Sequence, residues 1–269
     1  MPLLPLLSAA PRHRSARLRR GSSVPGLVLI LCGLAALLPT SAQATSLETT
    51  TTAAASTPMS APSRTNPLVA RPAASAPTTV SSQRITVRAR GTWATVTAWQ
   101  RTPSGWRRII ATRAGRIGSH GLVAGTKRIQ GTGTTPTGSY DMTEAFGVGP
   151  APGTRMRYRH VGRCDWWDAD RRSKYYNNRV NVCLTKPDFP LTERGRYGSE
   201  QLIRHAAIYR WAVVIDFNRP DPVRGRGAGI FLHVNDTRPT TGCVSVPYQT
   251  MRAILRWLDP ARHPQISIR

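Results

Sequence analysis

The chain has 269 residues, with 38 Lys and Arg against 13 Asp and Glu, which gives a formal net charge of +25. An apolar fraction of 40% with seven Trp and seven Tyr can form a core, which excludes a wholly disordered chain. The body of the chain has no long uncharged apolar run, and four cysteines are too few for a disulfide scaffold, so polytopic membrane proteins and disulfide-rich mini-proteins are also excluded.

The N-terminal 44 residues have the pattern of a secretory signal peptide. Five arginines and no acidic residue precede an apolar stretch, Val24–Leu38, and small residues then end in the sequence Ala42-Gln43-Ala44. A basic region, a short apolar region and an A-x-A site together predict export and cleavage after residue 44. An uncleaved membrane anchor is the alternative. Removing five arginines leaves 33 basic and 13 acidic residues, a net charge of +20, so the basicity does not come from the leader.

Residues 45–82 consist mainly of Thr, Ala, Ser and Pro, with almost no large apolar side chain. Such a segment cannot bury enough surface to offset chain entropy, so we expect a disordered linker. The folded domain is therefore expected over residues 83–269.

The first part of this domain is expected to form strands. Apolar and polar residues alternate over Ile85–Arg90 and Ala94–Trp99, a turn follows at Pro103–Gly105, and Trp106–Thr112 returns the chain. Alternation around a Pro/Gly turn is typical of a hairpin. Further on, the β-branched apolar runs Ala212–Phe217 and Gly229–Val234 predict buried strands.

One helix is expected near the C-terminus. It begins near Pro247, has apolar residues at helical spacing and ends at Asp259-Pro260; these apolar residues are Met251, Ile254, Leu255 and Leu258. A second helix is expected over Ser199–His205, and a short closing strand over Gln265–Arg269. The predicted fold class is mainly β, with one or two flanking helices.

The residues best suited to chemistry gather in one segment, Gly229–Pro247. A strand ends near His233, a polar loop follows, and Cys243 comes directly after Gly242. A histidine can take the proton of a thiol that then attacks a carbonyl, and a glycine lets backbone N–H groups approach an oxyanion. Taken alone, this pair also fits a buried cysteine and a hydrogen-bonded core histidine.

The same segment resembles the catalytic motif of the L,D-transpeptidase family, the YkuD-type domain, in which a strand ending in His is followed by Ser/Thr-x-Gly-Cys. An upstream stretch, Gly133–Tyr140, resembles the Thr-Pro-x-Gly-aromatic turn of that family. Further stretches, among them "DWWDAD" and "GCVSVP", resemble a secreted actinobacterial branch. The resemblance covers about residues 126–269 and implies an L,D-transpeptidase-like β-sandwich.

The resemblance implies a role for each matched residue. Cys243 would be the nucleophile that forms a thioester with a peptidoglycan stem peptide, and His233 would be the general base. The backbone around Gly242 and Cys243 would form the oxyanion hole, and Thr240 matches the Ser/Thr of the motif. Three positions depart from the pattern of the family and leave the donor and acceptor open; these are Thr241, Ser245 and Val234. A backbone carbonyl is then expected to hold the His233 ring, or Asn235 or Asp236 to replace the missing orienting group.

Export makes a disulfide between Cys164 and Cys183 reasonable, with two unrelated free thiols as the alternative. The bridge would close an 18-residue loop and leave Cys243 unpaired. The loop carries aromatic residues that either line a substrate cleft or pack the loop onto the sheet. Together with two residues of the motif segment they are the candidate substrate-binding residues: Trp166, Trp167, Tyr175, Tyr176, Ser245 and Asn235.

The predicted activity is that of a secreted or wall-associated cysteine acyltransferase, an L,D-transpeptidase. The alternatives are an L,D-carboxypeptidase of the same fold and a degenerate, basic module that binds the cell wall. Stem peptides are the expected partners, anionic wall polymers are further candidates, and we expect a monomer that binds no nucleic acid. Metal and phosphate-loop motifs are missing from the sequence, so neither a metal nor another cofactor is expected.

Overall fold

The computed structural model describes residues 80–195 and 198–269. The predicted signal peptide and nearly all of the predicted linker therefore lie outside the described residues. Within the described ranges, no helix has the length and apolar character needed to cross a membrane.

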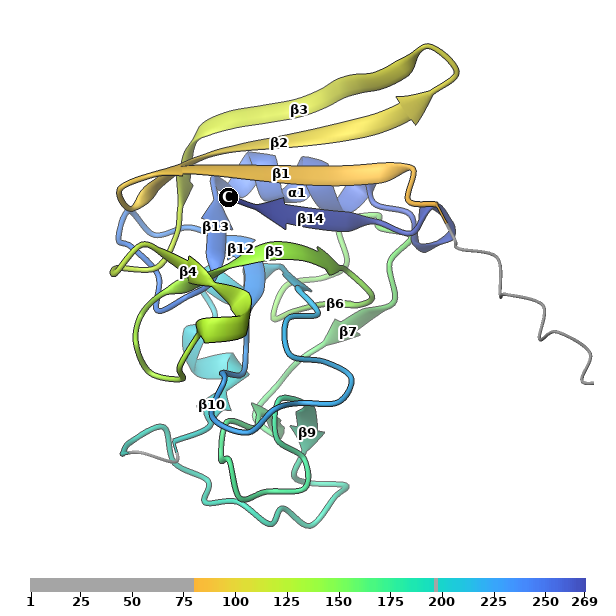
Figure 1. Ribbon diagram of the computed structural model, residues 1–269. Coiled ribbons are helices and arrows are strands. Elements are labelled where there is room, and N and C mark those ends of the chain that lie inside the picture. The colour runs from red at the N-terminus through yellow and green to blue at the C-terminus, as the bar shows by residue number, and fades with distance from the viewer. Residues whose placement is uncertain (1–79, 196–197) are drawn as a thin grey trace, which may run out of the picture. The chain divides into compact units, whose positions relative to one another are not determined.

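An eleven-stranded mixed sheet forms most of the domain, in the order β4-β5-β14-β1-β2-β3-β13-β12-β11-β6-β7. Its strands are β1 (Gln83–Arg90), β2 (Trp93–Thr102), β3 (Gly105–Arg116), β4 (Leu122–Ala124), β5 (Thr135–Asp141), β6 (Ala145–Gly147), β7 (Tyr158–His160), β11 (Ala212–Val214), β12 (Phe231–Val234), β13 (Val244–Val246) and β14 (Gln265–Ile268). A second sheet joins β10 (Glu200–Gln201), β8 (Asp165–Trp167) and β9 (Arg179–Asn181). In Figure 1 the long strands β1–β3 lie at one end of the domain and the small sheet lies at the other, among long loops.

The predicted hairpin is confirmed, because β2 and β3 pair antiparallel around the turn that follows Thr102. The closing strand is confirmed as β14, which pairs with β1 in parallel orientation and with β5 in antiparallel orientation. The two buried runs are also strands, β11 and β12, although each is shorter than the apolar run that predicted it.

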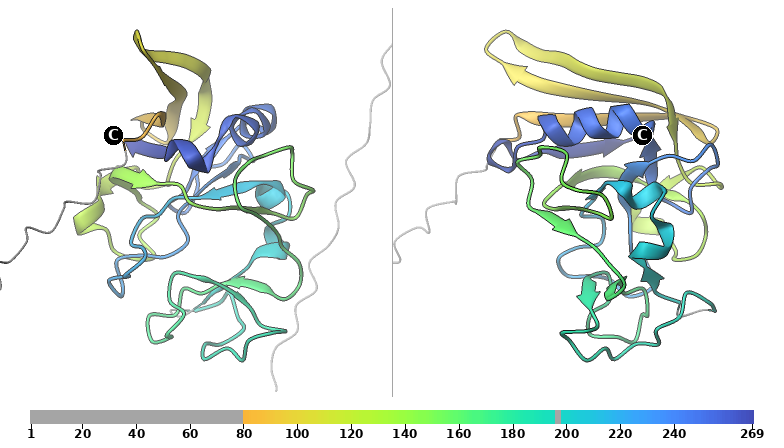
Figure 2. Two further views of the ribbon diagram at one scale, coloured as in Figure 1. Left: turned by 90° about the vertical axis from the view of Figure 1, so that its right-hand side faces the viewer. Right: turned by 180° about the vertical axis from the view of Figure 1, so that it is seen from behind.

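The predicted C-terminal helix is α1 (Tyr248–Trp257), which Pro247 precedes at the N-cap. Its buried face, made by Met251, Ile254 and Leu255, joins the main apolar cluster. Figure 2 shows α1 lying along the sheet, next to the long strands. This cluster also takes in the inward residues of β1, β2, β12 and β13, so α1 covers one face of the central strands.

The expected second helix over Ser199–His205 is wrong as an α-helix. Glu200 and Gln201 pair with Trp167 and Trp166 as strand β10, and only Leu202–His205 forms a helix, of the 3-10 type. Four residues are too few to offset the cost of helix nucleation, and the strand pairing uses the backbone groups that a longer helix would need. Three more 3-10 helices lie at Gly125–Lys127, Ile208–Arg210 and Pro260–Arg262.

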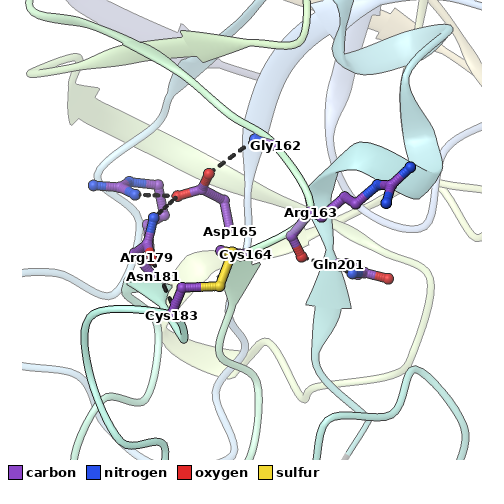
Figure 3. Close-up of a disulfide and its surroundings, with 8 residues drawn as sticks. All are labelled: Gly162, Arg163, Cys164, Asp165, Arg179, Asn181, Cys183 and Gln201. Atoms are coloured by element: carbon purple, nitrogen blue, oxygen red, sulfur yellow. Dashed lines mark hydrogen bonds and ion pairs between the residues drawn. A yellow bond between two sulfur atoms is a disulfide. The ribbon is translucent and has the colours of Figure 1, made fainter.

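A disulfide joins Cys164 to Cys183 at the end of the domain that holds the small sheet, as predicted. Figure 3 shows its surroundings. Asp165 pairs with Arg179 and accepts a hydrogen bond from the Gly162 N–H at 2.8 Å. These contacts and the pairing of β8 with β9 hold the segment that carries Trp167, whose ring packs on Phe146 and Phe231 of the large sheet.

Candidate active site

Strands β12 and β13 bring His233 and Cys243 to the same face of the sheet. The two strands are parallel, and His233 pairs with Ser245, two residues after Cys243. Paired residues of neighbouring strands point to the same side, and so do alternate residues of one strand. The neighbouring residues Leu232 and Val244, which pair with each other, therefore point the other way, into the main cluster under α1.

The thiol of Cys243 is buried and unpaired. Its residue is 5% exposed, and it is the one free cysteine in the described part of the chain. The sulfur lies 3.3 Å from the Gly229 carbonyl oxygen, to which it donates, and 3.4 Å from the Phe231 N–H, from which it accepts. Burial, with a smaller contribution from the negative charge of Glu200, raises the pKa of Cys243 to about 12. The resting group is therefore a thiol and not a thiolate.

His233 is held by a backbone carbonyl, as the sequence led us to expect for a chain without an orienting side chain. Its Nδ1 lies 2.7 Å from the Val234 carbonyl oxygen. A carbonyl only accepts, so Nδ1 carries the proton and Nε2 keeps a lone pair that can take a proton. Burial lowers the pKa of His233 to about 4, against a smaller raising effect of the Val234 carbonyl. The ring is therefore a neutral base at physiological pH, and the Tyr209 ring packs edge-on against it at 5.5 Å.

The turn before Cys243 is fixed by two threonines. Thr240 Oγ1 accepts from the Gly242 N–H at 3.1 Å and donates to the Cys243 carbonyl oxygen at 2.7 Å. Thr135 lies in the upstream Thr-Pro stretch, which forms the start of strand β5 and not a turn. It is fully buried, and its hydroxyl donates to the Gly242 carbonyl oxygen at 2.8 Å. The two sequence motifs therefore meet in space, and the start of β5 supports the backbone that carries the thiol.

Gly242 has φ +144, and its position leaves no room for a side chain. A Cβ there would lie 2.7 Å from Nη2 of Arg128 and 2.9 Å from the Thr134 carbonyl oxygen. The Gly242 N–H already donates to Thr240 and is not free to bind an oxyanion. The N–H groups of Thr241 and Cys243 remain as candidates for the oxyanion hole that the sequence predicts. Neither of these two groups donates to another atom of the residues that the structure describes.

Two cavities meet at Cys243. The larger, of about 430 Å³, is lined by Trp167, Arg128, Glu193, Gly242 and others. The smaller, of about 290 Å³, is lined by His233, Tyr209, Asp236, Thr240 and others. Four residues line both cavities: Glu200, His205, Thr241 and Cys243. The thiol can thus be approached from two sides.

Glu200 and Arg128 escaped the sequence prediction. Glu200 accepts a hydrogen bond from the Tyr209 hydroxyl at 2.9 Å, and its enclosure raises the pKa of its carboxyl group. His205, also on the cavity wall, lies 3.0 Å from Glu193. Arg128 is 6% exposed and lies beside Gly242. In a chain with 38 Lys and Arg, nothing in the sequence distinguishes Arg128 from the other arginines. Glu200 lies in a polar stretch without a recognisable motif, so the sequence carries no signal for either residue.

The structure separates the candidate substrate-binding residues. Trp167 lines the larger cavity and stacks on Phe146, whereas Trp166 and Tyr175 belong to a separate cluster with Val180 and Phe189. Tyr176 is 1% exposed and donates to Gln130 at 2.6 Å.

The two polar candidates of the motif segment lie outside the linings of both cavities. Ser245 is buried, with no hydrogen-bond partner for Oγ among the described residues. Asn235 donates to the Ala114 carbonyl oxygen at 2.8 Å. Asp236, the other residue considered for orienting His233, pairs with Arg238. Among the residues with described positions, no group of three His, Cys, Asp or Glu side chains is arranged to hold a metal ion.

Comparisons with known proteins give one family. The YkuD family, described as the L,D-transpeptidase catalytic domain, matches residues 79–266. No curated protein matches the chain. A solved structure titled "Structure of Bdellovibrio bacteriovorus Bd1075" is similar at 17% sequence identity and a TM-score of 0.35, over 70% of this chain and 48% of that one. The chain thus spans about half the length of that protein.

Proposed function

Because the chain belongs to the YkuD family of L,D-transpeptidase catalytic domains, we propose that it is a cysteine acyltransferase that acts on peptidoglycan stem peptides. The family as a whole acts on such peptides. The observation that carries the proposal for this chain is the position of Cys243, a free thiol at the meeting point of two cavities with the neutral base His233 on the same strand face.

The first half of the proposed reaction forms a thioester. The Cys243 sulfur attacks the carbonyl carbon of the donor peptide while its proton moves to Nε2 of His233. Because burial keeps both groups neutral at rest, attack and proton transfer are expected to be coupled and not to start from a preformed ion pair. The C–N bond then breaks, and His233 returns the proton to the leaving amine.

The second half releases the acyl group. An acceptor amine attacks the thioester carbonyl, His233 takes a proton from that amine, and the Cys243 thiol is regenerated. If water attacks instead, the product is a trimmed peptide, as in an L,D-carboxypeptidase. In both halves we expect the N–H groups of Thr241 and Cys243 to donate to the oxyanion.

We also propose that the protein works outside the cytoplasm. The Cys164–Cys183 disulfide supports this, because such bridges persist in oxidising compartments, and the leader-like residues 1–44 agree with it.

The test uses the purified protein and its Cys243→Ala variant with a disaccharide-tetrapeptide, and mass spectrometry of the products. We expect product from the wild type alone, as cross-linked dimers for a transpeptidase or tripeptides for a carboxypeptidase. Circular dichroism checks that the variant is folded. Equal product from both proteins would contradict the proposal, and no product from either would favour a wall-binding role.

A further inference from the structure

Arg128 is a buried cation without a counterion. Its Nε donates to the Thr134 carbonyl oxygen at 2.9 Å and its Nη1 to that of Arg226 at 3.1 Å. None of the ion pairs among the described residues includes Arg128. Removing a charge from water is costly unless it is paired, and an arginine stays protonated at any physiological pH. The site therefore holds a positive charge for which the described residues supply no ion pair.

The free end of this guanidinium faces the thiol region. Nη2 lies so close to Gly242 that it would be 2.7 Å from a Cβ there, and no described atom accepts a hydrogen bond from it. Arg128 also lines the larger cavity together with Gly242 and Cys243. A ligand group bound to Nη2 would thus lie next to the atoms that carry out the acyl transfer.

The charges on the cavity wall restrict what Nη2 can bind. Glu193 and Glu200 also line this cavity and are negatively charged when ionised. An anion is repelled by these carboxylates and attracted by Arg128, so Arg128 fixes where an anionic group can sit. A guanidinium group pairs well with the oxygens of a carboxylate or a phosphate, and a stem peptide carries carboxylates.

We propose that Arg128 binds a carboxylate of the donor peptide in the larger cavity, beside the carbonyl that Cys243 attacks. The inference rests on the proposed function, which makes stem peptides the substrates. A stem tetrapeptide offers two such groups, the carboxylate of its C-terminal D-amino acid and, where the third residue is a diamino diacid, the carboxylate of that side chain. Arg128 is a binding residue that distinguishes donors and takes no part in proton transfer.

Binding, measured without turnover, tests this. Isothermal titration calorimetry on the Cys243→Ala variant compares three disaccharide-tetrapeptides: one with a diaminopimelate third residue and a free C-terminus, its C-terminal carboxamide, and one with lysine as the third residue. We expect one of the two peptides that lack a carboxylate to bind about 10- to 100-fold more weakly than the first, as for a charge-assisted hydrogen bond. The peptide that loses affinity identifies which carboxylate is bound.

The same titrations with Arg128→Gln added should abolish that difference, so that all three peptides bind equally. Arg128→Lys, which keeps the charge and loses the planar fork, should keep part of it. Arg252→Gln on α1 is the matched control, because it removes one positive charge outside both cavities and should leave the difference unchanged.

Three results would overturn the inference: equal binding of the three peptides with Arg128 intact, no binding of any of them, or a difference that persists after Arg128→Gln. The first two use a protein that retains Arg128, so they do not depend on the folding of the Arg128 variant. Turnover is scored separately. Carboxylate-dependent binding without any Cys243-dependent product would leave the inference standing and contradict the proposed function.

Discussion

The two faces of strands β12 and β13 serve different purposes. On one face, Leu232 and Val244 are fully buried in the apolar cluster under α1. On the other, His233 and Cys243 lie at the edge of the cavities. Because side chains alternate along a strand, the same two short strands supply core residues on one face and site residues on the other. The comparison indicates that packing of the apolar face fixes the backbone of both strands, and the strands in turn position the thiol and the imidazole.

The His233→Ala variant gives the largest expected effect on the site face of the two strands. Removing the proposed general base should lower kcat/KM for acyl transfer by about 10²- to 10⁴-fold, with little change in the core under α1. Product analysis with the stem tetrapeptide measures the first effect, and thermal unfolding measures the second. A variant with wild-type kcat/KM would remove His233 from the mechanism.

Leu232→Ala, one residue earlier, is the matched change on the opposite face. It should lower the free energy of unfolding by about 2–5 kcal/mol, because the side chain is 0% exposed and leaves a cavity. Urea unfolding gives this value, and kcat/KM per folded molecule should stay close to that of the wild type. If instead activity collapses while stability is unchanged, the division between the two faces is wrong.

Acid should destabilise the protein through His233. Its pKa is about 4 in the folded protein and 6.5 for an exposed histidine, so between these values the unfolded chain binds a proton that the folded chain does not. The free energy of unfolding should therefore fall as the pH falls from 6.5 to 4, by up to about 3 kcal/mol from this group. Urea titrations at several pH values, for wild type and His233→Gln, isolate the contribution. Parallel curves for the two proteins would show that the pKa of His233 is not lowered by folding.

Glu200→Gln should make the thiol more reactive. The carboxylate of Glu200 helps to raise the pKa of Cys243, and the amide can still accept from Tyr209. We expect iodoacetamide to alkylate Cys243 several-fold faster at about pH 8, since each unit of fall in pKa raises the thiolate fraction about tenfold. Glu193→Gln is the control, because Glu193 is not among the groups that shift the Cys243 pKa. Equal rates for wild type and Glu200→Gln would exclude an electrostatic effect of Glu200 on the thiol.

Much of this domain could be predicted from local pattern. The hairpin of β2 and β3 has alternating residues around a turn, and α1 has an apolar face with a proline at its start, so short-range periodicity determines both. The proximity of His233 and Cys243 could be expected from a strand followed by a short loop, whereas the roles assigned to them come from the resemblance of the motif to the YkuD family and stay predictions.

The rest of the site depends on contacts between distant segments. Arg128 lies beside Gly242 although more than a hundred residues separate them, and Glu200 reaches the cavity walls on strand β10. Neither contact leaves a periodic trace in the sequence. The local pattern of Ser199–His205 favours a helix, but the pairing of this region with β8 is a tertiary effect that overrides local preference.

Intact-protein mass spectrometry of the protein after brief incubation with the stem tetrapeptide and acid quenching tests the central claim most directly. The account predicts a mass increase equal to the donor minus its leaving D-amino acid, mapped by proteolysis to Cys243 and missing in Cys243→Ala. An adduct that forms equally on Cys243→Ala, or turnover by the wild type without any covalent adduct under conditions that trap thioesters, would contradict it.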